Sequence, residues 1–170
     1  ERRIRARFHP RYGAAVTDGL FMSSRDGLHF HRWGEAFIRP GPQREGNWVY
    51  GDNYQCWGLL QTPAERPGEP DELSFVAVEH YWRGQGTVFR RFSLRLDGFG
   101  SVNAPMAGGE IVTRPLRFAG SRLYLNIATS AAGGAWVEVQ DAEGRSIPGY
   151  TLDDCYEIVG DEIERAARWR

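Results

Sequence analysis

The sequence predicts an all-β protein, and three observations lead to this prediction. Short runs along the chain alternate apolar and polar side chains, which is the pattern of strands with one buried face. Clusters rich in Gly, Pro and Asp separate these runs, and such clusters form turns. The chain of 170 residues includes 21 Gly, and aromatic residues make up 13% of the chain. This composition suits strands, and it also suits contact with carbohydrate.

The predicted strands follow one another along most of the chain. Residues 72–81 alternate most clearly, with Phe75, Ala77 and Glu79 on one face. Residues 161–168 suit a short helix as well as a strand, because acidic residues precede basic ones there. The remaining predicted strands are 19–23, 28–33, 56–62, 88–96, 109–113, 116–119, 122–129 and 135–141.

A Ser-Arg-Asp-Gly turn connects the first two predicted strands and indicates a β-hairpin. Gly27 supplies the positive φ that a tight turn needs, and Ser24 and Asp26 offer side-chain acceptors to the backbone of the turn. We therefore expect a structural role for Asp26. Gly144 marks a second turn of this kind, so another hairpin is predicted there.

Composition excludes several classes of function. The formal net charge is −1, which indicates neither a nucleic-acid partner nor a membrane partner. All 21 basic residues are Arg, so no mechanism can use a Lys nucleophile. Cys56 and Cys155 lack the spacing of a zinc site, although one disulfide between them stays open. No apolar run approaches the roughly 20 residues that span a bilayer, and no signal peptide is present.

The chain divides into two predicted β modules, residues 1–98 and 99–170. Long loops rich in Asp, Asn, His, Trp and Tyr join the strands of the first module, and short turns join those of the second. The sequence starts at Glu1 without Met and within strand-like sequence, so we expect a piece of a longer polypeptide.

Several motifs along the chain carry a resemblance. They are Ser24-Arg25-Asp26-Gly27-Leu28-His29-Phe30, Phe37-Ile38-Arg39-Pro40-Gly41, Asn47-Trp48, Asp52-Asn53, Leu94-Arg95-Leu96-Asp97-Gly98-Phe99, Ala107-Gly108-Gly109-Glu110, Thr129-Ser130-Ala131 and Gly160-Asp161-Glu162. Together they resemble a group of bacterial proteins related to glycoside hydrolases. In that group a five-bladed β-propeller, like those of the invertase and arabinanase clan, precedes a β-sandwich. The resemblance implies that this chain is the last part of a β-propeller followed by a jelly-roll or concanavalin-like β-sandwich module. The Ser-Arg-Asp-Gly turn is similar to a sialidase Asp-box, but it lacks the residue between Asp and Gly.

Antiparallel strands predict which polar residues share one rim of such a propeller. The start of the strand 56–62, the end of the strand 72–81 and the start of the strand 19–23 all meet there. Hydrolysis of a glycosidic bond needs two carboxylates. We assign Asp52 as base or nucleophile and Glu79 as acid, with Asp18 as a third candidate. The predicted substrate-binding residues are Asn53, Tyr54, Trp57, His80, Tyr81, Trp82 and Arg83.

A second hypothesis is a non-catalytic carbohydrate-binding or structural β module. In that case Asp52 caps a turn next to Asn53, and Glu79 pairs with Arg83 or Arg91. Ca²⁺ is the one cofactor considered, because oxygen ligands are offered by Asp153, Asp154, Glu157 and Asp161. These residues lack the spacing of an EF-hand, so a solvated acidic loop is the favoured interpretation. The expected partners are a carbohydrate and either the remainder of the same polypeptide or a second copy. A secreted or periplasmic location fits a glycan ligand.

Overall fold

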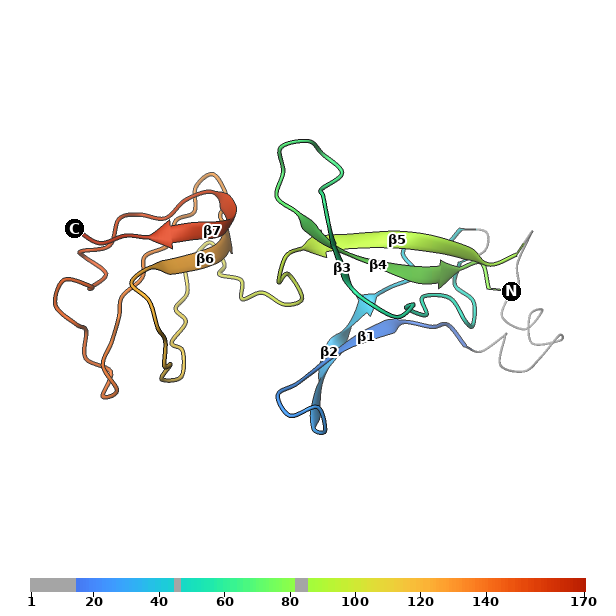
Figure 1. The fold of residues 1–170 in the computed structure, drawn as a ribbon, viewed down its shortest axis with the longest axis horizontal. Helices are drawn as coiled ribbons and strands as arrows, with labels where there is room; N and C mark the ends of the chain where they lie inside the picture. The colour runs from blue at the N-terminus through green and yellow to red at the C-terminus, as the bar shows by residue number, and fades with distance from the viewer. Residues whose placement is uncertain (1–14, 45–46, 82–85) are drawn as a thin grey trace. The chain divides into compact units, whose positions relative to one another are not determined.

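The computed structural model of the chain describes residues 15–44, 47–81 and 86–170. Within these ranges the chain forms seven strands and no helix, so the all-β prediction is confirmed. The strands are β1 (Gly19–Ser24), β2 (Phe30–Ile38), β3 (Leu60–Thr62), β4 (Glu72–Glu79), β5 (Val88–Arg95), β6 (Leu123–Ala128) and β7 (Asp161–Ala167). They pair antiparallel into three small sheets, β1-β2, β3-β4-β5 and β6-β7 (Figure 1). A search of the same ranges for a long apolar helix of membrane-spanning length finds none.

The chain separates into two compact units, Glu1–Phe99 and Gly100–Arg170. Unit 1 contains β1 to β5, and unit 2 contains β6 and β7. Each unit has a small apolar core of its own. The described residues of neither unit close into a propeller or a sandwich.

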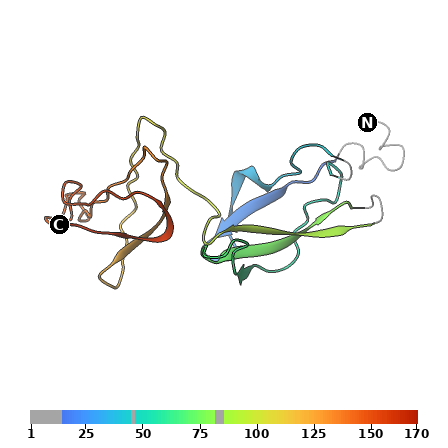
Figure 2. The same ribbon diagram turned by 90° about the horizontal axis from the view of Figure 1, so that it is seen from above.

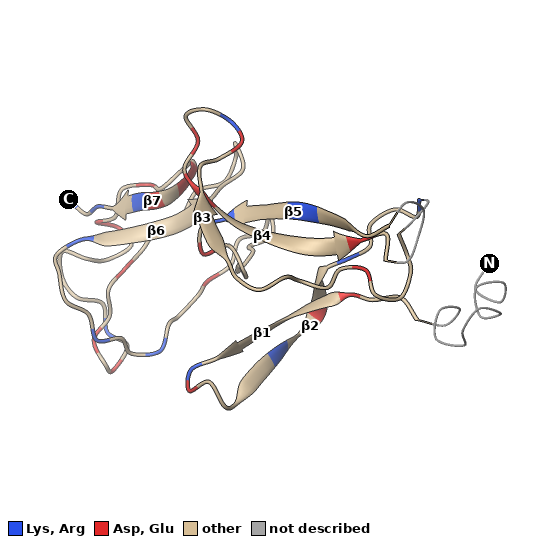
Figure 3. Cartoon of the chain, turned by 45° about the vertical axis from the view of Figure 1, so that its right-hand side comes forward, with Lys and Arg blue, Asp and Glu red and all other residues tan. Residues whose placement is uncertain are grey.

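The β1-β2 hairpin forms where the Asp-Gly turn predicts it. Gly27 has a φ of 74°, as the tight turn requires. The Asp26 carboxylate accepts hydrogen bonds from the backbone N–H groups of Leu28 and His29 at 2.9 and 2.8 Å, and from the Ser24 hydroxyl at 2.9 Å. The bonds from His29 and its neighbours hold the pKa of Asp26 well below its ordinary value. The turn projects away from the β3-β4-β5 sheet (Figures 1 and 3).

The core of unit 1 lies between the hairpin and the three-stranded sheet, which lie side by side in Figure 2. On β4, Phe75, Ala77 and Glu79 are buried, as the alternation predicts. The Phe75 ring lies 5.9 Å from that of Phe37 at the end of β2, and 5.4 Å from that of Phe92 on β5. These aromatic contacts attach the hairpin to the sheet and position the loops that follow β2 and β4.

Two predicted strands of unit 1 have wrong boundaries. The prediction 28–33 begins too early and ends too early, because the turn extends to residue 29 and the pairing with β1 continues to Ile38. The prediction 56–62 is too long, because only Leu60–Thr62 forms a strand. Gly58 has a φ of 102°, which is incompatible with extended pairing and separates this strand from the bridge between Gln55 and Ala77.

In unit 2, residues 161–167 form a strand and not a helix, because they pair with β6 over Leu123–Ala128. The predictions of strands at 109–113, 116–119 and 135–141 are wrong. Within the described ranges, residues 109–119 pair with no other strand, and a strand needs a partner for its backbone groups. Residues 135–141 make isolated bridges to Ile158 and Ser146, and the second bridge closes the predicted turn around Gly144.

Candidate functional site

The loop before β3 lies along the last half of β4, as the rim prediction requires. Asn53 N–H donates to the Val78 carbonyl at 2.7 Å, and Val78 N–H donates to the Tyr54 carbonyl at 3.0 Å. This antiparallel pairing brings Asp52 next to the residues that end β4. The structure therefore places the two predicted catalytic carboxylates, Asp52 and Glu79, in one neighbourhood of unit 1.

The Asp52 side chain is enclosed, with an exposed fraction of 2%. Its Oδ1 accepts a hydrogen bond from the backbone N–H of Tyr81 at 2.9 Å, whereas the buried Oδ2 has no partner in the structure. Burial raises the pKa of the Asp52 carboxyl, and the nearby charge of Glu79 adds to the rise, against the opposing effect of the Tyr81 and His80 backbone groups. Asp52 thus links the loop before β3 to the end of β4, in an environment that raises the pKa of its carboxyl.

The backbone around Asp52 is anchored to the segment before β1. Gly51 N–H donates to the Thr17 hydroxyl at 3.0 Å, and the Asn53 amide donates to the Thr17 carbonyl at 2.8 Å. Asn53 has a φ of 63° and is 5% exposed, and its side chain connects this loop to the segment before β1. These bonds bring the start of β1, with Asp18, beside the Asp52 loop.

Glu79 is held by two arginines. Arg44 Nη2 lies 3.2 Å from each carboxylate oxygen, and Arg90 Nε lies 2.7 Å from Oε2. The Glu79 side chain is 9% exposed, while each guanidinium is about half exposed. Its oxygens are therefore occupied by ion pairs that join the loop after β2 to β5. Figure 3 shows the acidic end of β4 and the basic band on the neighbouring strand β5.

The predicted substrate-binding residues fall into three sets: those near the end of β4, the exposed Trp57, and two that lie outside the described residues. His80 and Tyr81 follow β4 directly, and the ring of Tyr81 lies 6.0 Å from that of Tyr50, which in turn lies 6.5 Å from that of Tyr54. Trp57 is fully exposed on the loop before β3. Trp82 and Arg83 lie outside the described residues.

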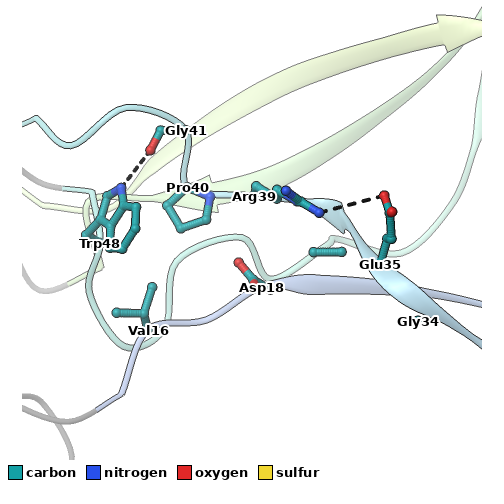
Figure 4. A pocket seen from close by; sticks show the side chains of 9 residues that line it. Val16, Asp18, Gly34, Glu35, Arg39, Pro40, Gly41 and Trp48 are labelled. Atoms are coloured by element: carbon teal, nitrogen blue, oxygen red, sulfur yellow. Dashed lines mark hydrogen bonds and ion pairs between the residues drawn. The ribbon is translucent and has the colours of Figure 1, made fainter.

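A separate open cavity of about 630 Å³ lies beside this region, and we call it the Trp48 hollow. Its walls come from Val16 and Asp18, from residues 34–36 and 39–41, and from Trp48. Figure 4 shows Asp18, Arg39 and Glu35 along it, with the Trp48 indole at one end. Of the three predicted catalytic carboxylates, Asp18 is the exposed one, and it lines this hollow and not a cleft with Asp52 and Glu79.

The wall around Trp48 is rigidly built. Trp48 has a φ of 58°, a strained conformation for a bulky residue, and its indole N–H donates to the Gly41 carbonyl at 2.7 Å. The buried Asn47 amide donates to the carbonyls of Pro40 and Pro42 at 2.7 and 2.8 Å. These bonds hold the 40–42 turn and the indole in fixed positions, so the local strain at Trp48 is maintained by its surroundings.

Sequence reasoning missed several residues that build these sites. The sequence suggested Arg83 or Arg91 as the partner of Glu79, but the structure pairs Glu79 with Arg44 and Arg90. Arg91 lies 3.8 Å from Glu72 instead, and Arg83 lies outside the described residues. Trp48, Arg39 and Glu35 were not predicted to line a cavity. A signal existed for Trp48, since the Asn47-Trp48 pair and the preceding Pro-Gly turn stood out as motifs.

The acidic loop of unit 2 is organised by its own hydrogen bonds. Asp154 Oδ2 accepts from the Thr151 hydroxyl at 2.8 Å. Across residues 15–44, 47–81 and 86–170, no three His, Cys, Asp or Glu side chains gather as a metal site would require. Cys56 and Cys155 are both free thiols.

Comparison of the chain with family models, curated proteins and solved structures finds no match.

Proposed function

We propose that unit 1 binds a carbohydrate in the Trp48 hollow without cleaving it. The observation that supports this proposal is the anchored indole of Trp48, carried on a positive-φ backbone, beside the exposed Asp18 and Arg39 side chains. An aromatic ring can stack on the apolar face of a sugar, and carboxylate and guanidinium groups bind hydroxyls. The cavity volume of about 630 Å³ lies within the range of small-molecule sites.

The proposal includes the finer fold inferred from the resemblance. In it, unit 1 is the last part of a β-propeller, and unit 2 belongs to a β-sandwich. The β1-β2 hairpin and the antiparallel β3-β4-β5 sheet are compatible with pieces of blades. Large apolar side chains on these strands are exposed, Leu20, Met22 and Phe89 among them, as expected for strands that are covered by further blades.

Cleavage of a glycosidic bond by Asp52 and Glu79 is the second candidate function. One observation favours it, because a general acid needs a raised pKa and burial raises the pKa of Asp52. This assigns the acid role to Asp52 and not to Glu79, whose oxygens are engaged by Arg44 and Arg90. Both carboxylates are buried, so a substrate reaches them only if the Asp52 loop opens. Binding in the hollow needs no such movement.

The binding proposal is tested by screening the 170-residue chain against a panel of neutral, amino and acidic oligosaccharides, followed by calorimetric titration of the best ligand. Trp48→Phe keeps a ring in the hollow but loses the bond to Gly41, and Trp48→Ala removes the ring. We expect the affinity to fall severalfold in the first variant and at least tenfold in the second. Trp57→Ala is the matched control, because this fully exposed indole lies outside the hollow and its removal should leave the affinity unchanged.

Two results would count against this assignment. If Trp57→Ala abolishes binding and Trp48→Ala does not, the ligand site is the exposed loop before β3. If sugar release is detected and Asp52→Asn or Glu79→Gln abolishes it with circular dichroism unchanged, the second candidate function replaces the first. Thermal unfolding of each variant separates a loss of binding from a loss of folding.

A further inference from the structure

Charge is unevenly distributed along the Trp48 hollow. Its lining includes two carboxylates, from Asp18 and Glu35, and one guanidinium, from Arg39, so the lining carries a net charge of −1. Figure 4 shows these three side chains near one another, with the Trp48 indole beyond Pro40. A sugar that enters the hollow therefore meets an excess of negative charge.

The guanidinium is already associated with one of the two carboxylates. Arg39 Nη2 lies 3.8 Å from Glu35 Oε2, and this pair is drawn as a dashed line in Figure 4. The two side chains are 63% and 93% exposed, so the pair is weak, but their charges offset each other. The negative charge that remains is that of Asp18.

Asp18 is available to a ligand. It is exposed at the start of β1, and its carboxylate makes no hydrogen bond or ion pair with any other described residue. The neighbouring Thr17 is fixed by its bonds to Gly51 and Asn53, so the backbone that carries Asp18 is anchored. A carboxylate on an anchored backbone, without a partner among the described residues and in a cavity with an aromatic wall, is suited to bind a cationic group on a ring.

We propose that the Trp48 hollow prefers a sugar with a free, protonated amino group, with Asp18 as the residue that determines this preference. The inference rests on the proposed carbohydrate binding and names its ligand class. The ammonium group pairs with Asp18, a neutral sugar binds less tightly, and a uronic acid is repelled. Two unit charges about 5 Å apart in water change an affinity about fourfold, and partial burial increases the effect.

The test uses four β-1,4-linked trisaccharides that share one backbone geometry and differ in charge: those of glucosamine, N-acetylglucosamine, glucose and glucuronic acid. Each is titrated calorimetrically into the 170-residue chain at about pH 6 and low salt, where such an amine is protonated and carboxylates are ionised. We expect the glucosamine trimer to bind at least about fourfold more tightly than the two neutral trimers, and the glucuronic acid trimer to bind most weakly. The preference should shrink as salt is added.

Asp18→Asn removes the charge and keeps the shape. It should bring the glucosamine trimer to the affinity of the neutral trimers and leave their affinity unchanged. Asp97→Asn is the matched control, because it makes the same change in net charge on the same unit, at an exposed turn residue outside the hollow. It should leave the preference intact.

The outcomes distinguish the two proposals. If neutral trimers bind in a Trp48-dependent manner without a preference for the amine, or if Asp18→Asn keeps that preference, the charge inference is overturned and carbohydrate binding stands. If Asp97→Asn removes the preference as well, the net charge of the unit is responsible and Asp18 is not the determinant. If none of the four trimers binds and the wider panel also yields no ligand, both proposals are overturned.

Discussion

Replacement of Gly51 by Ala should destabilise unit 1, because this glycine occupies a position without room for a side chain. Its φ is 90°, where L residues other than glycine are strained. A Cβ built on Gly51 would lie 2.5 Å from Cγ and 2.8 Å from Cε1 of the Tyr81 ring. The bond from its N–H to Asp52 holds the Tyr81 backbone, and its ring packs against that of Tyr50 at 6.0 Å.

Two costs add in the Gly51→Ala variant. The positive φ costs a non-glycine residue roughly 1–2 kcal/mol. Overpacking against the Tyr81 ring adds about 1–3 kcal/mol. We therefore expect the free energy of unfolding to fall by about 2–5 kcal/mol, which is a large fraction of the roughly 5–15 kcal/mol of a typical domain.

Gly68→Ala separates these two costs. Gly68 also has a φ of 90°, but no atom lies within 4 Å of its added Cβ. This control should lose about 1–2 kcal/mol at most, because only the backbone strain remains. Urea titrations followed by tryptophan fluorescence give both values, with the slope m compared to exclude a change in the unfolded state. If the two variants lose equal stability, the packing of Tyr81 on Gly51 is not as described, and the arrangement of the Asp52 loop is wrong.

Three further predictions concern the buried groups of unit 1. Glu79→Gln should lower the free energy of unfolding by about 1–3 kcal/mol in urea titrations, because two guanidinium groups lose their carboxylate. Its control is Glu35→Gln, at a 93% exposed side chain, which should change the free energy of unfolding by at most about 0.5 kcal/mol. Burial raises the folded-state pKa of Asp52 above 3.8, so between 3.8 and the raised value the folded state keeps a proton that the unfolded state releases. Stability therefore falls as the pH rises through this window. Asp52→Asn should flatten this slope, which is measured from unfolding midpoints across the window. Phe75→Ala should cost about 3–5 kcal/mol by thermal unfolding, whereas Phe89→Ala, at a 67% exposed ring of the same sheet, should cost less than about 1 kcal/mol.

Each of these predictions has an outcome that contradicts it. Equal effects of the two Glu→Gln changes would mean that the ion pairs of Glu79 contribute nothing beyond those of a solvated carboxylate. An unchanged pH slope in Asp52→Asn would show that Asp52 is not the group that titrates. Similar losses for Phe75 and Phe89 would place the apolar core elsewhere in the unit.

The parts of the fold that depend on neighbouring residues could be predicted from the sequence. The Asp26 turn is built from side-chain acceptors and a positive-φ glycine within six residues, and it forms as expected. The alternation in residues 72–81 predicted the buried face of β4. The strands at 109–113 and 116–119 could not be judged in the same way, because a strand exists only when another strand pairs with it, and sequence periodicity contains no information about the partner.

The candidate site shows a similar division. Antiparallel pairing was enough to predict that Asp52 lies beside the end of β4. It could not predict that Asp52 is enclosed, or that Glu79 is held by Arg44 and Arg90. Burial and ion pairing are set by side chains that approach from other elements, and no local pattern encodes their positions.

By itself, the sequence determined an all-β chain, the hairpin around Asp26 and the buried face of β4, because period-two alternation and turn chemistry act over a few residues. Only the tertiary structure decided which carboxylates are exposed. It enclosed Asp52 beside the end of β4, it paired Glu79 with two arginines, and it left Asp18 in an open hollow with Trp48. The physical reason is that accessibility and charge environment depend on how distant loops pack, and the three segments that form the hollow come together only in the folded unit.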